Sequence, residues 1–384
     1  MNFSKRTEWP KASNRLTLLA EEMRKAGQPF IDLTESNPTL CSFKVLNFDL
    51  LKPLANLANL VYEPDPLGSP AARLAVCRYY ADKKIKVRPE QVILTSSTSE
   101  AYAFLFRLLL DPGEKIAVPA PSYPLLDSLS RLSDAQMVRY RYFYEERWRV
   151  DLKSLKEGSK AVCVVNPNNP TGNFIREEEK KGFNKFCAAG RAAIISDEVF
   201  LDYPFQKQSV KPSSFAGNEE TLTFVLSGLS KVLALPQMKV SWIVASGPED
   251  LLAEALRRLE IIADTYLSVN TPAQAALEVW LQKIPEVNRE ISDRTISNYE
   301  FLKKNLAECR ELQVLDSEGG WVAVVRVDSP MDDEEFSFKL LETAGVLVHP
   351  GYLYDFEEGK HLILSLLLPP GPFKEAVLRM SRLT

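Results

Sequence analysis

The feature that most constrains the fold is an alternation of strand-like and helical runs that begins at Gln91. QVILTSS is typical of a buried strand, and TSEAYAFLFRLLLDPG follows it as a helical run closed by Asp111–Pro112–Gly113. KIAVPAPSYP, AVCVVNPNNPTGN and AAIISDEVF continue the pattern. Strands that alternate with helices predict an α/β fold with a mostly parallel sheet, covered on both faces. Polar residues at the strand ends should then meet at one edge, where such sheets bind ligands.

The chain is expected to form a large domain and a smaller one. After Pro248 the pattern turns helical, and strand-like runs return near the C-terminus as GGWVAVVRV, VLVHP and HLILSLLL. We interpret residues 1–45 as an N-terminal arm and part of the small domain, and residues 46–274 as the large domain. Residues 275–384 then complete a small α+β domain.

The composition excludes several classes of partner. Of the 384 residues 45% are hydrophobic, and the formal net charge of −4 is spread without long basic runs, which argues against nucleic-acid or membrane-surface binding. The five cysteines are scattered and lack CxxC spacing, which indicates a reducing compartment and no cysteine-based metal site. No apolar run forms a signal core or is long enough to cross a bilayer. We therefore expect a cytoplasmic protein.

The segment Thr223–Ser246 contains the candidate nucleophile, Lys231. Two apolar runs flank a loop too short for a crossover helix of usual length, so the runs are expected to be antiparallel neighbours. Lys231 then lies at the mouth of a strand, partly shielded from water. Burial favours the neutral amine, which is the nucleophilic form that Schiff-base chemistry requires. A solvated surface lysine is the commoner meaning of such a position.

Three other strand ends carry polar candidates. The hydroxyl residues from Ser96 to Ser99 open a helix, and free N–H groups at a helix start suit a phosphate, although an ordinary N-cap is the alternative. The segment from Asn166 to Gly172 is made of turn-forming residues and could serve only as a rigid turn. Asp197 directly follows an apolar strand, with a solvated loop acid or helix cap as the alternative.

Together, a lysine, a phosphate-binding helix start and a carboxylate at a strand end indicate pyridoxal 5′-phosphate. The lysine would hold the cofactor aldehyde as an imine, and the carboxylate would keep the pyridine nitrogen protonated, so that the ring accepts electrons from the substrate.

The ordered motifs NPNNPTG, SDEVF and GLSK resemble the class I/II aminotransferases of pyridoxal-phosphate fold type I. The similarity extends from IDLTESNP through YEPDPLGSPAAR and PAPSYP to the HPG segment near Pro350. Each motif alone is a weak signal, but the ordered set, with each member in its predicted strand-end context, is specific. The resemblance implies the large and small domains of that fold type.

The resemblance also implies roles for residues. Lys231 matches the lysine that forms the imine and moves the proton, and Asp197 matches the partner of the pyridine nitrogen. Asn169 matches the donor to the phenolic oxygen of the cofactor. Tyr123 matches the aromatic residue that stacks on the ring, with a core tyrosine as the alternative.

Phosphate binding is implied for a second group of residues. Ser97 and Thr98 match the phosphate loop, and Lys239 and Ser230 lie in the cofactor-binding segment around Lys231. Tyr62 matches a tyrosine that reaches the phosphate of a neighbouring subunit, which implies a homodimer with shared active sites; a surface tyrosine is the alternative.

The sequence departs from the family pattern at four positions. Phe200 replaces a tyrosine that would bond the phenolic oxygen, and Lys239 replaces an arginine and so lacks its bidentate fork. Gly228 replaces the serine three positions before the lysine, although Ser227 and Ser230 are adjacent. Ile363, within HLILS, replaces the arginine that binds the substrate carboxylate.

The implied activity is transfer of an amino group from a small-molecule amino donor to a keto or aldehyde acceptor. A lyase or decarboxylase acting on an amino acid would use the same motifs and stays open, as does a non-catalytic sensor built on this fold. Ile363 favours a substrate without a carboxylate at that point, or a different cation; Arg15, Arg73 and Arg326 are the candidates that the sequence offers.

Overall fold

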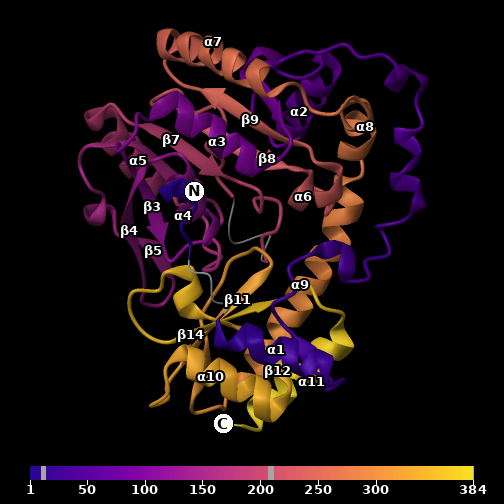
Figure 1. The fold of residues 1–384 in the computed structure, drawn as a ribbon, viewed down its shortest axis with the longest axis vertical. Coiled ribbons are helices and arrows are strands. Elements are labelled where there is room, and N and C mark those ends of the chain that lie inside the picture. Colours follow the sequence, from indigo (N-terminus) through magenta and orange to yellow (C-terminus); the bar gives the residue numbers. More distant parts are fainter. Residues whose placement is uncertain (10–13, 206–211, 384) are drawn as a thin grey trace.

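The computed structural model describes residues 1–9, 14–205 and 212–383. Figure 1 shows two parts: a large sheet with its helices in the upper half, and a smaller group of strands and helices in the lower half. The N-terminal helix α1 lies with the C-terminal segments in the lower part. Segments from both ends of the chain therefore build the smaller part together.

The large sheet has eight strands in the order β2-β9-β8-β7-β6-β3-β4-β5. Its central strands are parallel, whereas β9 runs antiparallel to both β2 and β8, and β5 is antiparallel to β4. The expectation that the two runs flanking Lys231 are antiparallel neighbours is thereby confirmed. The strands are β2 Val92–Thr95, β3 Lys115–Ala120, β4 Gln136–Tyr144, β5 Trp148–Val150, β6 Ser159–Val165, β7 Ala193–Asp197, β8 Thr223–Gly228 and β9 Ser241–Ser246.

Helices cover both faces of this sheet, as the alternating pattern predicts. One face packs against α3 Thr98–Leu109, α4 Leu125–Leu132 and α7 Glu249–Tyr266, and the other packs against α2 Pro70–Asp82, α5 Glu177–Gly190 and α8 Thr271–Leu281. Successive strand residues point to opposite faces: Val92 and Leu94 join one core cluster, and Ile93 joins the other. Burial of both faces explains why the strands read as continuous apolar runs.

The smaller part contains two sheets. A four-stranded sheet has the order β10-β11-β14-β13, and β1 pairs in parallel with β12. The long helix α9 packs against α11, and α1 packs against α10. The strands are β1 Ile31–Asp32, β10 Leu312–Val314, β11 Val322–Val327, β12 Val346–Leu347, β13 His349–Pro350 and β14 His361–Ser365, and the helices are α1 Arg15–Lys25, α9 Ile284–Leu306, α10 Asp333–Lys339 and α11 Pro370–Ser381.

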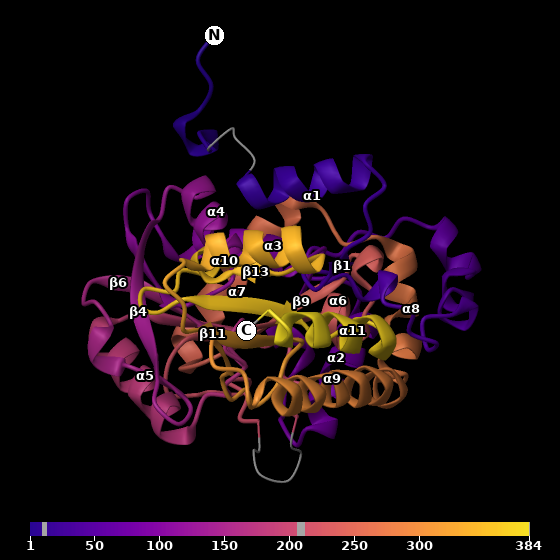
Figure 2. The ribbon, with the colours of Figure 1, turned by 90° about the horizontal axis from the view of Figure 1, so that it is seen from below.

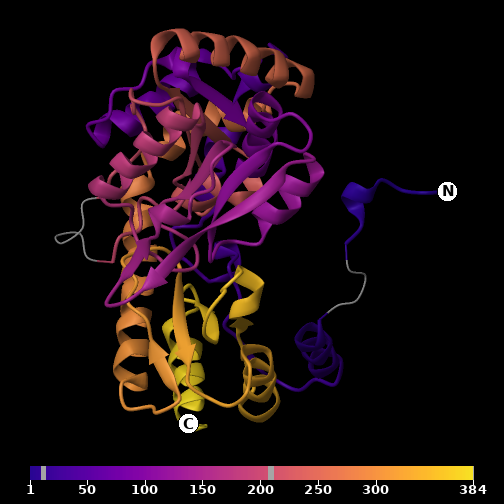
Figure 3. The same cartoon turned by 90° about the vertical axis from the view of Figure 1, so that its left-hand side faces the viewer.

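The first nine residues lie at the outer surface, and the N-terminus points away from the body (Figures 2 and 3). Arg6 pairs with Asp134, and Arg131 donates to the Glu8 carbonyl oxygen, so this segment is attached beside α4. Across the described ranges, no helix has the length and hydropathy to cross a bilayer.

Candidate active site

A cavity of about 310 Å³ lies where the carboxyl ends of the parallel strands face the smaller part. The large sheet contributes the ends of β6, β7 and β8 and the start of β9. The smaller part contributes residues from β11, β13 and β14 and the segment after β1. The residues that line the cavity include Thr98, Tyr102, Tyr123, Asn169, Asp197, Phe200, Ser230, Lys231, Ser241, Trp321, His349, Tyr354, Ile363 and Ser365.

Lys231 lies in the short helix α6, Leu229–Val232, directly after β8. Its backbone carbonyl oxygen accepts a hydrogen bond from the Tyr203 hydroxyl at 2.6 Å. Its Nζ lies 5.6 Å from the centroid of the Phe200 ring and 5.1 Å from that of Trp321. Burial lowers the pKa of Lys231 from 10.5 to about 8, against the opposing effect of Asp197. About a tenth of the amine is therefore neutral at pH 7, far more than for an ordinary lysine, as nucleophilic chemistry requires.

Asp197 ends β7 and faces the same cavity. The Val199 backbone N–H donates to its Oδ1 at 3.3 Å, and the Tyr102 hydroxyl donates to its Oδ2 at 3.1 Å. Burial nevertheless raises the pKa of Asp197 to about 6, because desolvation outweighs these hydrogen bonds and the charge of Lys231. A carboxylate in this state would gain strongly from a cationic partner placed in the cavity.

Tyr102 is a site residue that the sequence analysis missed. It lies in α3, is 3% exposed and lines the cavity next to Asp197. In the sequence, Tyr102 stands in TSEAYAFLF among several other residues of the apolar helix face and does not differ from them in pattern. Only the packing of α3 beside β7 brings its hydroxyl to the carboxylate, so no local signal could have identified it.

Three predicted residues line the cavity beside Lys231 and Asp197. The Asn169 Oδ1 is buried without a hydrogen-bond partner among the described residues, so this amide is available to a bound group. Tyr123 is 49% exposed and so is not a core tyrosine. Ser230, immediately before Lys231, also faces the cavity.

The start of α3 supplies a candidate anion site. Thr98 is the first helical residue and lines the cavity, whereas Ser97 is the N-cap, and its hydroxyl accepts from the Glu100 backbone N–H at 3.1 Å. Ser97 therefore fixes the helix start, and Thr98 presents it to the cavity. The first-turn N–H groups and the positive end of the helix dipole favour an anion.

These features agree with comparisons of the whole chain. The family model described as "Aminotransferase class I and II" matches residues 58–361. The chain belongs to this family. Class I and II aminotransferases move an amino group from an amino donor to a keto acceptor, and this chain is accordingly an aminotransferase.

Individual relatives agree with this assignment. The aminotransferase is 24% identical over 374 residues to glutamate-pyruvate aminotransferase AlaA of Haemophilus influenzae, covering 94% of this chain and 92% of that protein. It is 24% identical over 361 residues to an alanine aminotransferase of Mycobacterium tuberculosis, covering 91% of this chain and 84% of that protein. The structure of an alanine aminotransferase from Pyrococcus furiosus superposes with a TM-score of 0.90 at 25% identity, covering 100% and 99% of the two chains.

The residues of this aminotransferase fit pyridoxal phosphate, the cofactor that the family generally uses. Lys231 offers an amine with a lowered pKa, and Asp197 offers a partly buried carboxylate whose pKa burial raises. The Asn169 side-chain amide and the α3 start provide polar groups for the ring and the phosphate. The donor set therefore matches the chemistry of the cofactor.

Three predicted cofactor residues lie outside the cavity lining: Ser97, the N-cap of α3, and also Lys239 and Tyr62. Lys239 is exposed, in a left-handed conformation with φ 54°, at the end of the turn that follows α6. Tyr62 is 67% exposed, in the loop that leads to α2. Both side chains face solvent in the single chain, and neither contacts the groups around Lys231.

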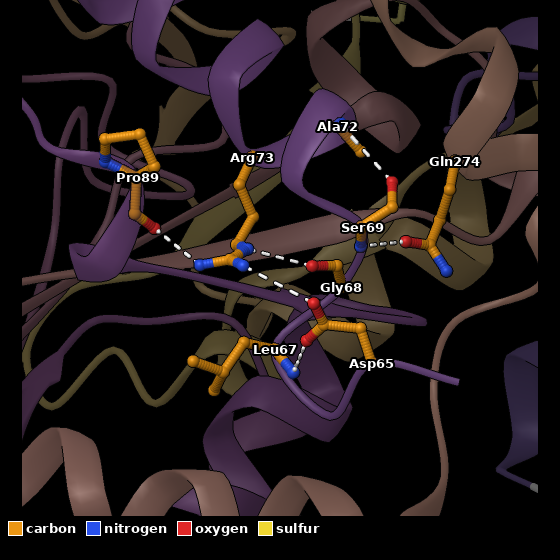
Figure 4. Close-up of polar contacts among 8 residues, drawn as sticks. All are labelled: Asp65, Leu67, Gly68, Ser69, Ala72, Arg73, Pro89 and Gln274. Carbon is orange, nitrogen blue, oxygen red and sulfur yellow. Dashed lines mark hydrogen bonds and ion pairs between the residues drawn. The ribbon is translucent and has the colours of Figure 1, made fainter. Parts of the chain in front are cut away.

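The loop between Tyr62 and α2 is nevertheless firmly held (Figure 4). Arg73 donates to the Gly68 carbonyl oxygen at 2.8 Å and to the Pro89 carbonyl oxygen at 3.2 Å, and it pairs with Asp65 at 3.4 Å. A Cβ on Gly68, whose φ is +92°, would lie 2.5 Å from a Leu94 side-chain carbon. Arg73 is thus committed to shaping this loop and does not reach the cavity.

No arginine lines the cavity within the part of the chain that the structure describes. Arg15 is exposed and lies over the Phe338 ring at 4.2 Å, and Arg326 lies on β11 with its side chain toward solvent. Ile363 is 1% exposed and pairs across β13 and β14 with His349, which also lines the cavity. Burial lowers the pKa of His349, so the wall around Ile363 carries no fixed cation near neutral pH.

Proposed function

We propose that this aminotransferase binds pyridoxal 5′-phosphate in the cavity, with Lys231 as its attachment point. The pairing of Lys231 and Asp197 in one cavity, with the lysine pKa lowered and the carboxyl pKa raised by burial, carries the proposal. When bound, the cofactor supplies an electron sink for the substrate carbon that loses its proton. The Lys231 Nζ would take that proton and pass it on within the site, in each of the two half-reactions of a ping-pong cycle.

The remaining residues of the proposed site hold the cofactor in place. Asp197 keeps the pyridine nitrogen protonated, with Tyr102 and the Val199 backbone N–H orienting the carboxylate. The Asn169 side-chain N–H would donate to the phenolic oxygen, and the Tyr123 ring would cover the cofactor ring. The phosphate is bound by the α3 start at Ser97 and Thr98, with Ser230 and Lys239 as further contacts.

The lowered pKa of Lys231 predicts how cofactor capture depends on pH. Only the neutral amine attacks the cofactor aldehyde. The Lys231 amine is half neutral at about pH 8, whereas an ordinary lysine is half neutral only at pH 10.5. The second-order rate constant for cofactor uptake by cofactor-free protein should rise from pH 7, reach half of its maximum at about pH 8 and level off about one pH unit higher. Stopped-flow absorbance would measure this profile, and a rate that continues to rise through pH 10 would show that Lys231 is not perturbed.

We propose further that the preferred substrate has no carboxylate on its reacting carbon. A carboxylate beside Ile363 would lose its hydration without gaining an ion pair, which is costly. The wall instead offers apolar contacts and the His349–Tyr354 pair, whose Nδ1 and hydroxyl oxygen are 3.2 Å apart. An amine donor and an aldehyde acceptor fit this wall. Alanine is the substrate named for several relatives, but at 24% identity this does not fix the substrate of this chain.

Matched donor pairs test this substrate preference. We expect kcat/KM to be higher for 3-methylbutylamine than for L-leucine, which differs by the carboxylate alone, and activity with alanine and 2-oxoglutarate to be weak. Ile363→Arg should shift the ratio toward the amino acid by about tenfold or more, as for a hydrogen bond to a charged group. Ile363→Leu, which conserves volume, is the control and should leave the ratio unchanged. Efficient turnover of alanine by the unmodified enzyme, with a submillimolar KM, would refute the preference.

We propose a homodimer with shared active sites. The segment before α2 exposes Phe48, Leu57, Leu60, Val61 and Tyr62, with exposed fractions from 55% to 84%. Such a concentration of apolar side chains is typical of an interaction surface. Sedimentation equilibrium should give the mass of two chains, and Tyr62→Ala should weaken cofactor binding at the neighbouring site. A monomer at micromolar concentration with full cofactor affinity would rule this assembly out.

We also propose that residues 46–274 form the cofactor-binding domain, with residues 1–45 and 275–384 contributing the arm and the small domain. The five cysteines of the chain are all unpaired. This supports a reducing compartment, and we propose the cytoplasm.

A further inference from the structure

Gly228 is the departure from the family pattern that the structure explains most directly. It is the last residue of β8, three positions before Lys231, where the family has a serine. Its φ of 174° is ordinary extended backbone that any residue adopts, so conformation does not require a glycine here. The glycine is required because there is no room for a side chain. A Cβ on residue 228 would overlap the Ser241 hydroxyl and would lie 2.7 Å from the Ser241 Cβ and 2.9 Å from its Cα.

Ser241 faces Gly228 from the neighbouring strand. The two residues are directly paired in the antiparallel register of β8 and β9, and both line the cavity. On its other side Ser241 pairs with Thr95, at the end of the strand that leads to α3. Ser241 therefore lies between the segment that carries Lys231 and the helix start that carries Thr98.

The Ser241 hydroxyl has no partner of its own. The residue is 1% exposed overall and lines the cavity, and no hydrogen bond joins its Oγ to another described side chain. A hydroxyl at the cavity wall that makes no bond within the protein can donate to a bound anion.

We propose that Ser241 supplies the hydroxyl that binds the phosphate group of the cofactor, in the space that a serine at position 228 would occupy. The inference rests on the proposed function, because it assigns a residue to the phosphate end of the same site. A hydroxyl donates to an anionic oxygen beside the positive end of α3. The two residues have exchanged roles: position 228 has lost its side chain, and the facing position provides the hydroxyl.

Cofactor dissociation constants separate this role from simple space filling. Ser241→Ala keeps the Cβ and removes only the hydroxyl. It should weaken binding of pyridoxal 5′-phosphate about tenfold or more, the effect of losing a hydrogen bond to a charged group. Binding of pyridoxal, which lacks the phosphate, should change by less than about threefold. Equilibrium dialysis and quenching of protein fluorescence report both constants without any turnover.

Two further variants complete the test. Ser246→Ala removes a buried, unpartnered hydroxyl from the far end of β9, outside the cavity, and should leave both constants unchanged. Gly228→Ser combined with Ser241→Gly moves the hydroxyl to the facing strand and should restore phosphate-dependent affinity to within about threefold of the native value. Gly228→Ser alone should bind poorly, because the two side chains overlap.

The outcomes distinguish the inference from the proposed function. Ser241 does not bind the phosphate if the dissociation constants of Ser241→Ala equal those of Ser246→Ala, or if Ser241→Ala weakens the binding of pyridoxal and of pyridoxal 5′-phosphate equally. This conclusion holds whether or not the exchanged double variant folds. If the native protein binds no cofactor at Lys231, the proposed function itself fails, and the inference fails with it.

Discussion

Lys231→Ala is expected to abolish turnover. The neutral amine of this residue is proposed both to hold the cofactor and to move the proton at the substrate carbon, so both contributions are lost together. A positioned acid or base alone contributes about 10²- to 10⁴-fold, so kcat should fall by at least this factor. The cofactor should still bind, but more weakly and without a covalent link, because Asp197, Asn169 and the α3 start remain.

Single-turnover absorbance changes with a saturating amine donor would measure this effect. Lys160→Ala is a matched control. Lys160 is an exposed lysine on strand β6 of the same sheet, where it pairs with Glu114, and it lies outside the cavity. It should leave the rate unchanged. A Lys231→Ala protein that converts its cofactor at more than about a tenth of the native rate would exclude Lys231 as the proton-transfer group.

Asp197→Asn should produce the second largest loss. An ionised carboxylate against a protonated pyridine nitrogen is a charge-assisted hydrogen bond in a mostly buried site, worth about 1.5–3 kcal/mol. The interaction strengthens as charge develops on the ring, so the loss should fall on the chemical step, by about 10- to 100-fold. Rapid-mixing measurement of the half-reaction rate constant checks this prediction, and an unchanged constant would reject the role.

The neighbouring acid, Glu198, offers a buried control. Glu198 is 1% exposed, and burial raises its pKa to about 7, but its oxygens accept from Ser196, Ser214 and the Phe215 backbone N–H. Glu198→Gln should therefore affect stability and leave the half-reaction within about threefold of native. Tyr102→Phe, which removes one hydrogen bond to Asp197, should fall between the two variants in rate.

Most of the fold could be predicted from the sequence because the signals are local. Strand and helix periodicity, with turn residues between the runs, gives the alternation from β2 to β9, and the short connection around Lys231 gives the antiparallel pairing of β8 and β9. Since parallel strands end at the same edge, residues after different strands were expected to meet. Asn169, Asp197 and Lys231 do line one cavity.

The remaining site residues depend on contacts that no local pattern encodes. Tyr102 reaches Asp197 only because α3 packs beside β7, and Ser241 fills the space beside Gly228 only because of the strand register. His349 lies next to Ile363 for the same reason, across β13 and β14. A single sequence does not specify such non-local registers.

Lys239 and Tyr62 match family positions that the fold of one chain does not bring to the cavity. Both residues occupy family positions in the sequence, yet the single chain holds both side chains in solvent, away from the cavity lining. Their proposed contacts with the phosphate depend on assembly or rearrangement rather than on the fold of one chain.

Mapping the site of cofactor attachment tests directly whether Lys231 binds the cofactor in this cavity. The purified holoenzyme would be reduced with borohydride, digested, and analysed by mass spectrometry for the stable cofactor adduct. We predict a single adduct on Lys231, lost in Lys231→Ala and retained in Lys160→Ala. An adduct on another lysine, or none at all on a protein that binds the cofactor, would contradict the assignment of this cavity as the active site.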